Sequence, residues 1–122
     1  MLNNLKKELQ MIADYLQYKI VIKDINDDIQ INDWLIVSIQ DRKVNSLFGK
    51  REVPHYVVEG MVVIPGRNYL SNGDPGYPDE TDYEELACDR NIFVIARTIL
   101  LKLFEQDMIN FQGSIQETDN DL

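Results

Sequence analysis

Apolar residues near the start of the chain recur at intervals of three and four, the spacing that places side chains on one face of a helix. They are Leu2, Leu5, Leu9, Ile12 and Leu16. Charged residues such as Lys6 and Asp14 fall on the opposite face, as expected for a helix with one buried side. The pattern predicts a helix over residues 3–18, with Asn3 or Asn4 as its N-cap.

After residue 18 the pattern changes from helical spacing to alternation. Residues 18–25 (YKIVIKDI) and 33–40 (DWLIVSIQ) are rich in β-branched side chains, and Asn and Asp residues suited to a turn lie between them. We therefore expect two antiparallel strands. In the second, one face would carry Leu35, Val37 and Ile39, and the other Trp34, Ile36 and Ser38. Both faces are largely apolar, which predicts a central strand covered on two sides.

A connection at residues 41–52 (DRKVNSLFGKRE) combines basic and apolar residues. Its cations are Arg42, Lys43, Lys50 and Arg51, and its apolar residues are Val44, Leu47 and Phe48. We expect the apolar group to pin the connection to the core. Residues 55–64 (HYVVEGMVVI) then predict a strand that Pro65 and Gly66 terminate. Gly60 within it is a candidate for a bulge or for relief of crowding.

The clearest helical pattern lies at residues 91–111. Ile92, Ile95, Ala96, Ile99 and Leu103 follow helical spacing, Phe93, Leu100 and Phe104 widen the stripe, and Asn91 or Asp89 can cap the helix. So wide a stripe indicates either deep burial or contact with a second chain. Gly113 is expected to stop the helix. We predict one domain over residues 1–112 and a disordered acidic tail over 113–122.

Residues 67–86 (RNYLSNGDPGYPDETDYEEL) interrupt the patterned chain with about twenty residues rich in Asn, Gly, Pro and carboxylates. Toward the end, residues 81–89 fit either a short strand or a helical turn, and we favour the strand. The predicted fold is α+β: an N-terminal helix, an antiparallel sheet of three or four strands, a long acidic loop, and a C-terminal helix packed on the sheet.

Composition narrows the possible functions. The chain has 122 residues and a net charge of −9, which argues against direct binding of nucleic acid, because phosphates require a basic surface. No apolar run is long enough to cross a membrane, and we expect a cytoplasmic protein. Cys88 is the only cysteine and His55 the only histidine, which excludes an internal disulfide and a zinc site built from several Cys and His.

Catalytic and metal-binding readings find little support in the sequence. Cys88 and His55 could form a nucleophile and base, but no third group is indicated to orient them. The carboxylates of residues 74–85 offer oxygen ligands for calcium, but their spacing does not fit an EF-hand loop. We therefore expect no enzyme activity, no cofactor and no metal.

The long acidic loop is the preferred binding surface. Loops of this length are often functional, and tyrosines are enriched at protein interfaces. The predicted partner-binding residues are Asp74, Tyr77, Asp79, Glu80, Asp82, Tyr83, Glu84 and Glu85. Such a surface suits a basic protein partner, and solvation alone is the simpler explanation of the charge.

Two hypotheses about function follow. In the first, the acidic surface binds a basic partner, for example as a decoy that inhibits a nucleic-acid-binding host protein. In the second, the protein is a structural or assembly subunit, such as a virion component, which self-associates through its C-terminal helix and strand edges. In its small size, acidity and tyrosine- and proline-containing loop, the chain is similar to many small proteins encoded by bacteriophages and mobile elements. Salt should dissociate the first kind of complex and spare an apolar assembly.

Overall fold

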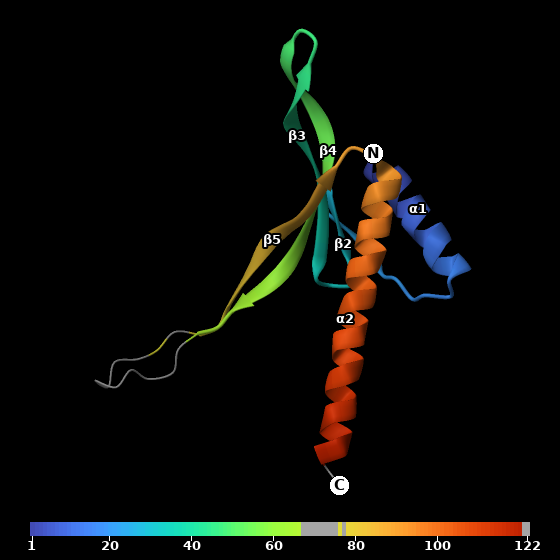
Figure 1. The fold of residues 1–122 in the computed structure, drawn as a ribbon, viewed down its shortest axis with the longest axis vertical. Coiled ribbons are helices and arrows are strands. Elements are labelled where there is room, and N and C mark those ends of the chain that lie inside the picture. The colour runs from blue at the N-terminus through green and yellow to red at the C-terminus, as the bar shows by residue number, and fades with distance from the viewer. Residues whose placement is uncertain (67–75, 77, 121–122) are drawn as a thin grey trace.

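The protein is an α+β structure with both helices on one side of an antiparallel sheet (Figure 1). A computed structural model describes residues 1–66, 76 and 78–120, with side chains described through residue 112. The elements are α1 (Leu2–Tyr15), β1 (Ile22–Ile25), β2 (Asp28–Ile31), β3 (Leu35–Ser46), β4 (Gly49–Ile64), β5 (Glu80–Asp89) and α2 (Ile92–Asn120). The strands pair with their neighbours in chain order, β1 to β5. The predicted α+β class is confirmed.

The sheet has five strands, so the prediction of three or four was wrong. The difference lies at β2, a strand of four residues in a stretch expected to be a turn. Backbone turns at Asn26, with φ of 54°, and at Asn32 and Asp33, with φ of 50° and 65°, enclose β2. Asn and Asp tolerate this left-handed region better than other side-chain-bearing residues do. Two tight turns therefore fit where the sequence indicated one.

β3 and β4 form a long hairpin, and residues 41–52 continue both strands instead of forming a loop over the core. The chain reverses at Leu47 and Phe48, and Gly49 follows with φ of 108°, a conformation open to glycine. The side chains of Leu47 and Phe48 are 98% and 99% exposed. The prediction that they pin this segment to the core was wrong, because the hairpin carries them away from it (Figure 1).

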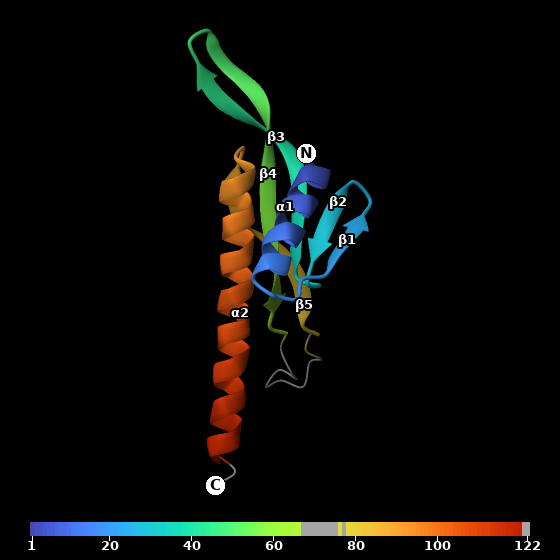
Figure 2. The same cartoon turned by 90° about the vertical axis from the view of Figure 1, so that its right-hand side faces the viewer.

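The core lies between the helices and one face of the sheet (Figure 2). α1 contributes Leu5, Leu9 and Ala13, the sheet Ile29, Ile31, Leu35, Val37, Tyr56 and Val58, and α2 Ile95, Ala96, Ile99, Leu100 and Leu103. The apolar spacing of both helices correctly predicted their buried faces. Trp34 was expected on the opposite face from Leu35, but it precedes β3 and packs against this core.

The N-terminus of α1 differs from the prediction. The helix begins at Leu2, its N-cap is Met1, and no side chain caps it. Asn3 and Asn4 lie inside the first turn and cannot act as caps. The helix ends at Tyr15, three residues before the predicted limit, and the chain turns at Gln17 with φ of 54°.

Gly60 lies at a close approach between β4 and β5. The register between these strands shifts at Val58 and Glu59, so that Leu86 stands as an extra residue on β5. A Cβ atom on Gly60 would lie 2.7 Å from Cδ1 of Leu86, closer than normal van der Waals contact. Gly60 therefore relieves crowding against Leu86. The bulge itself lies next to Gly60, at Val58 and Glu59.

α2 begins as predicted and is longer than predicted. Oδ1 of Asn91 accepts hydrogen bonds from the N–H groups of Phe93 and Val94 at 2.9 and 3.4 Å, which confirms Asn91 as the cap. The helix continues through Gly113 to Asn120, since one glycine costs a helix only about 1 kcal/mol. The division of the chain into a domain over 1–112 and a tail over 113–122 stays a prediction.

A contact between α2 and the segment after α1 fixes the helix at the edge of the core. The ring of Tyr18 packs edge-on against Phe104 with centroids 4.9 Å apart, and its hydroxyl donates a hydrogen bond to Asp107. Burial, then the hydrogen bond and the negative charge of Asp107, raise the pKa of Tyr18 to about 12. The hydroxyl therefore remains a donor at neutral pH.

Candidate protein-interaction surfaces

The interior offers no site for chemistry in the described part of the chain. Every buried residue there is apolar apart from the tyrosine hydroxyl of Tyr56 and the backbone, and no buried side-chain nitrogen or oxygen lacks a hydrogen-bond partner. Among the described residues, no group of three or more His, Cys, Asp and Glu is placed to hold a metal ion. The candidate sites are therefore on the surface.

The sheet face away from the helices carries a polar network. Nη2 of Arg42 lies 2.6 Å from Oε1 of Glu85 and 3.0 Å from Oε1 of Gln40. The amide of Gln40 donates in turn to Oγ of Ser38 at 3.1 Å. Val57 pairs with Ser38 in the sheet and is fully buried without belonging to the helix-side core. These polar side chains therefore cover an apolar centre on a face that no helix covers.

Cys88 and His55 both lie on this outer face but show no arrangement for catalysis. Cys88 pairs with Val57, and His55 is two residues from Val57 on the same strand. Burial raises the pKa of the Cys88 thiol, Arg42 opposes this, and Glu85 and Asp89 add to it. A raised pKa keeps the sulfur protonated and weakly nucleophilic. Nδ1 of His55 lies 2.6 Å from the carbonyl oxygen of Val53, a contact that holds the ring against its own strand.

Six of the eight predicted partner-binding residues lie in the described chain; Asp74 and Tyr77 fall outside it. The structure divides these six instead of gathering them. Asp79 accepts a hydrogen bond from the backbone N–H of Gly66 at 2.6 Å. Glu80, Asp82, Tyr83, Glu84 and Glu85 all belong to β5, which confirms that residues 82–88 form strand and not helix.

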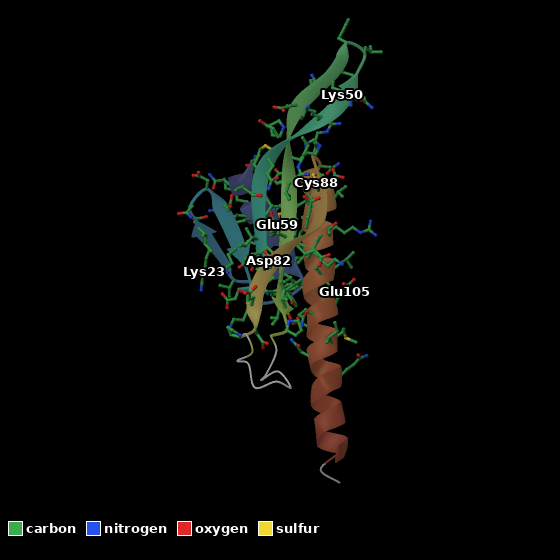
Figure 3. All side chains as sticks on the ribbon, turned by 90° about the vertical axis from the view of Figure 1, so that its left-hand side faces the viewer. Lys23, Lys50, Glu59, Asp82, Cys88 and Glu105 are labelled. Atoms are coloured by element: carbon green, nitrogen blue, oxygen red, sulfur yellow. The ribbon has the colours of Figure 1, made fainter. Side chains whose placement is uncertain are left out.

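Strand alternation separates these β5 residues into two sets. Glu80, Asp82 and Glu84 share one face of the strand and are exposed. Tyr83 and Glu85 share the other face, and the carboxylate of Glu85 is taken up by Arg42. The described part of the predicted acidic loop thus forms an exposed row of three carboxylates, and Glu85 is instead ion-paired with Arg42 of the neighbouring hairpin. Figure 3 shows Asp82 and Glu59 along this part of the sheet.

Beyond Gly60, β4 pairs only with β5. β3 begins at Leu35, opposite Gly60, so Met61–Ile64 pair with Glu80–Tyr83 and with no other strand of the described sheet. We call residues 61–64 and 80–84 the ribbon. It extends away from the helices (Figure 1) and exposes Met61, Val63, Ile64 and Tyr83. Of these, Ile64 shares the face of the three carboxylates because it pairs with Glu80, and the other three lie on the opposite face.

The tip of the β3–β4 hairpin is a second surface, which the sequence analysis expected to be pinned to the core. Lys43, Lys50 and Arg51 are exposed beside Leu47 and Phe48, and they form no ion pair with any residue that the structure describes. A usable signal was present in the sequence. Basic pairs at 42–43 and 50–51 are symmetric about a Gly-containing centre, which is the pattern of a hairpin with a basic tip.

α2 supplies the third surface. Next to α1 it borders a groove of about 300 Å³ that Ile12, Phe93, Arg97, Leu100, Leu101 and Phe104 line. Further along, Met108, Ile109 and Phe111 are 57%, 60% and 61% exposed. Among the side chains of α2 that are described, which end at residue 112, Leu103 is the last buried one. The helix then continues past the sheet (Figure 2).

The described chain thus presents three extensions, each with exposed large apolar side chains: the hairpin tip, the ribbon and the far half of α2. No helix in the described ranges is long and apolar enough to cross a membrane. Contiguous exposed apolar groups on a protein surface are typical of interaction sites.

Comparisons with known proteins find no matching family model, no matching curated protein and no matching solved structure.

Proposed function

We propose that the protein is a non-catalytic assembly subunit that associates with copies of itself through α2. The observation that carries this proposal is the apolar stripe on that helix. Leu101, Phe104, Met108 and Phe111 follow one another at intervals of three, four and three residues, the spacing of the a and d positions in a coiled coil. Three of the four are exposed in the single chain.

Most of the stripe is exposed in the described structure. Phe104 packs on Tyr18, but Met108 and Phe111 lie beyond Leu103 and are exposed. The groove beside α1 joins the stripe through Leu101 and Phe104. A second α2 laid along the stripe would extend apolar contact from the groove to Phe111. Such pairing buries residues that a lone copy leaves in water.

Adding charge to the stripe should prevent association. In the double variant Met108→Lys and Phe111→Lys, we expect the wild-type oligomer to become a monomer, because both cations would be buried without partners in the interface. Analytical ultracentrifugation in high salt measures the change, and circular dichroism checks that the fold is retained.

A control variant adds the same charge to the opposite side of α2. Gln106→Lys with Asn110→Lys should leave the oligomer intact. A wild-type protein that stays monomeric in high salt at every concentration would contradict the proposed function, as would two variants that behave alike.

A second candidate function is binding of a basic partner by the exposed carboxylates Glu80, Asp82 and Glu84. Two observations support this function. The alternation of β5 places all three carboxylates on one face of the ribbon, and no described residue forms an ion pair with them. Electrostatic contacts of this kind give fast, salt-sensitive association. The decoy or inhibitor role is one form of this function.

Neutralising the three carboxylates tests this second function. Glu80→Gln, Asp82→Asn and Glu84→Gln together should abolish capture of a basic protein that elutes from the wild type with salt. Asp27→Asn, Asp28→Asn and Asp41→Asn remove the same charge elsewhere and should leave capture unchanged. Equal binding by both variants would exclude the ribbon as the binding surface.

A further inference from the structure

Two ends of the molecule carry opposite charge. Residues 42–51 contain four cations and no carboxylate. Arg42 is paired with Glu85, which leaves Lys43, Lys50 and Arg51 around the exposed Leu47 and Phe48. The hairpin tip therefore combines exposed apolar side chains with three cations, and Glu52 stands opposite Lys43 at its base.

The ribbon carries the opposite charge to the hairpin tip. Residues 61–64 and 80–84 contain Glu80, Asp82 and Glu84 and no Lys or Arg. On the face of these carboxylates the ribbon exposes Ile64, with the partly buried Val62 beside it. Apart from the Met61 N–H, which donates to the carbonyl oxygen of Trp34, the edge of β4 beyond Gly60 has no neighbouring strand in the described sheet. An apolar group surrounded by cations would find here both apolar contact and three carboxylates that form no ion pair with a described residue.

We propose that the hairpin tip of one copy docks on the ribbon of a second copy, head to tail. Three exposed cations would face three exposed carboxylates, and Leu47 and Phe48 would contact the apolar side chains of the ribbon. The hairpin and the ribbon point away from each other in the same molecule (Figure 1). The tip of a chain therefore cannot contact the ribbon of the same chain. This inference rests on the proposed role as an assembly subunit.

The ribbon suits the tip better than the groove beside α1 does. Arg97 lines that groove and would repel the cations of the tip. The overall charge of −9 likewise opposes an approach of the hairpin to an anionic membrane. Because the contact joins two different surfaces, repetition would build a ring or an open filament. Together with pairing through α2, the protein would have two separate interfaces.

Charge reversal tests the contact in the full chain. One variant carries Lys43→Glu, Lys50→Glu and Arg51→Glu; the other carries Glu80→Lys, Asp82→Lys and Glu84→Lys. Each variant alone has two ends of like charge, and we expect its head-to-tail association to weaken at least about tenfold. An equimolar mixture should regain association, because each reversed end then meets an opposite one. Ultracentrifugation in low and high salt measures both effects.

The design separates this contact from the one through α2. Head-to-tail association should disappear in high salt and should persist in the Met108→Lys, Phe111→Lys background, whereas association through α2 should show the opposite behaviour. A wild type without salt-sensitive association, or a mixture that stays as dissociated as its components, would overturn the head-to-tail contact and leave the α2 proposal standing.

A crosslinking experiment locates the contact without reversing any charge. With the photoreactive p-benzoylphenylalanine in place of Phe48, and isotope-labelled and unlabelled chains mixed, we expect crosslinks between copies at residues 61–64 and 80–84. Crosslinks to Ile12, Phe93 or Leu101 would place the tip in the groove and overturn the proposal. The absence of any crosslink between copies would overturn it as well.

Discussion

Replacing Ile99 with alanine should lower the free energy of unfolding by about 2–5 kcal/mol, the range for removing a large aliphatic side chain from a well-packed core. Ile99 is fully buried on α2, within the cluster that joins both helices to the sheet. Its loss would leave a cavity that rigid strands on one side and α1 on the other cannot close. Leu103, which is also buried, should behave in the same way.

The matched control is Leu101→Ala, two residues further along the same helix. Leu101 is about half exposed, so that its truncation removes little buried surface, and we expect a loss below about 1 kcal/mol. Urea unfolding followed by far-UV circular dichroism measures both variants, at several protein concentrations to keep association separate from stability. Equal losses would mean that α2 is not seated on the sheet as the structure shows.

The helices and their buried faces could be predicted because their evidence is local. A helix repeats every 3.6 residues, so Leu5 and Leu9, or Ile95 and Ile99, reveal a shared face without any knowledge of what lies opposite. The capping role of Asn91 is local as well. The N-cap of the first helix was predicted incorrectly, because Asn3 and Asn4 are both typical cap residues. The helix begins earlier, at Leu2, and its N-cap is Met1.

The fifth strand was missed because β2 has only four residues and lies between two turns. Asp28–Ile31 alternates correctly, with Ile29 and Ile31 buried, but the surrounding Asn and Asp residues are equally typical of one irregular connection. What makes the segment a strand is its pairing with Leu35–Val37 on one side and with β1 on the other. Such pairing is a tertiary property.

The exposed hairpin tip was misjudged for a related reason. Hydrophobicity indicates that Leu47 and Phe48 favour burial, but whether they reach the core depends on the length and direction of β3 and β4. The strands continue past the body, and the tip follows them. An apolar pair that cannot reach its own core is informative about function, because a partner is then the remaining way to bury it.

The acidic site stays a prediction. The six of its residues that the structure describes are exposed, but Glu85 lies 43 positions from Arg42 in the chain, and nothing in the sequence indicates that this carboxylate is paired. Glu80, Asp82 and Glu84 stay in the candidate surface because the alternation of β5 turns them to one face.

The largest single effect is expected at Val58. Val58 is fully buried on the helix side of β4, and its neighbours across the sheet, Val37 and Ala87, are apolar. Val58→Asp would place a carboxylate among the buried apolar side chains of the core, and we expect a loss above about 4 kcal/mol at neutral pH, enough to unfold most of the protein. Val63→Asp is the matched control, since Val63 lies on the same strand and is 57% exposed.

The two substitutions should also respond differently to pH. Burial would raise the pKa of the carboxyl introduced at position 58 above the value of about 3.9 that it has in the unfolded chain. Between those two values the folded chain binds more protons, so stability relative to wild type should rise as pH falls through this window. At position 63 the carboxyl titrates in water in both states, and its small effect should not change with pH. Unfolding curves that run parallel for the two variants from neutral to acidic pH would show that Val58 does not face an apolar core.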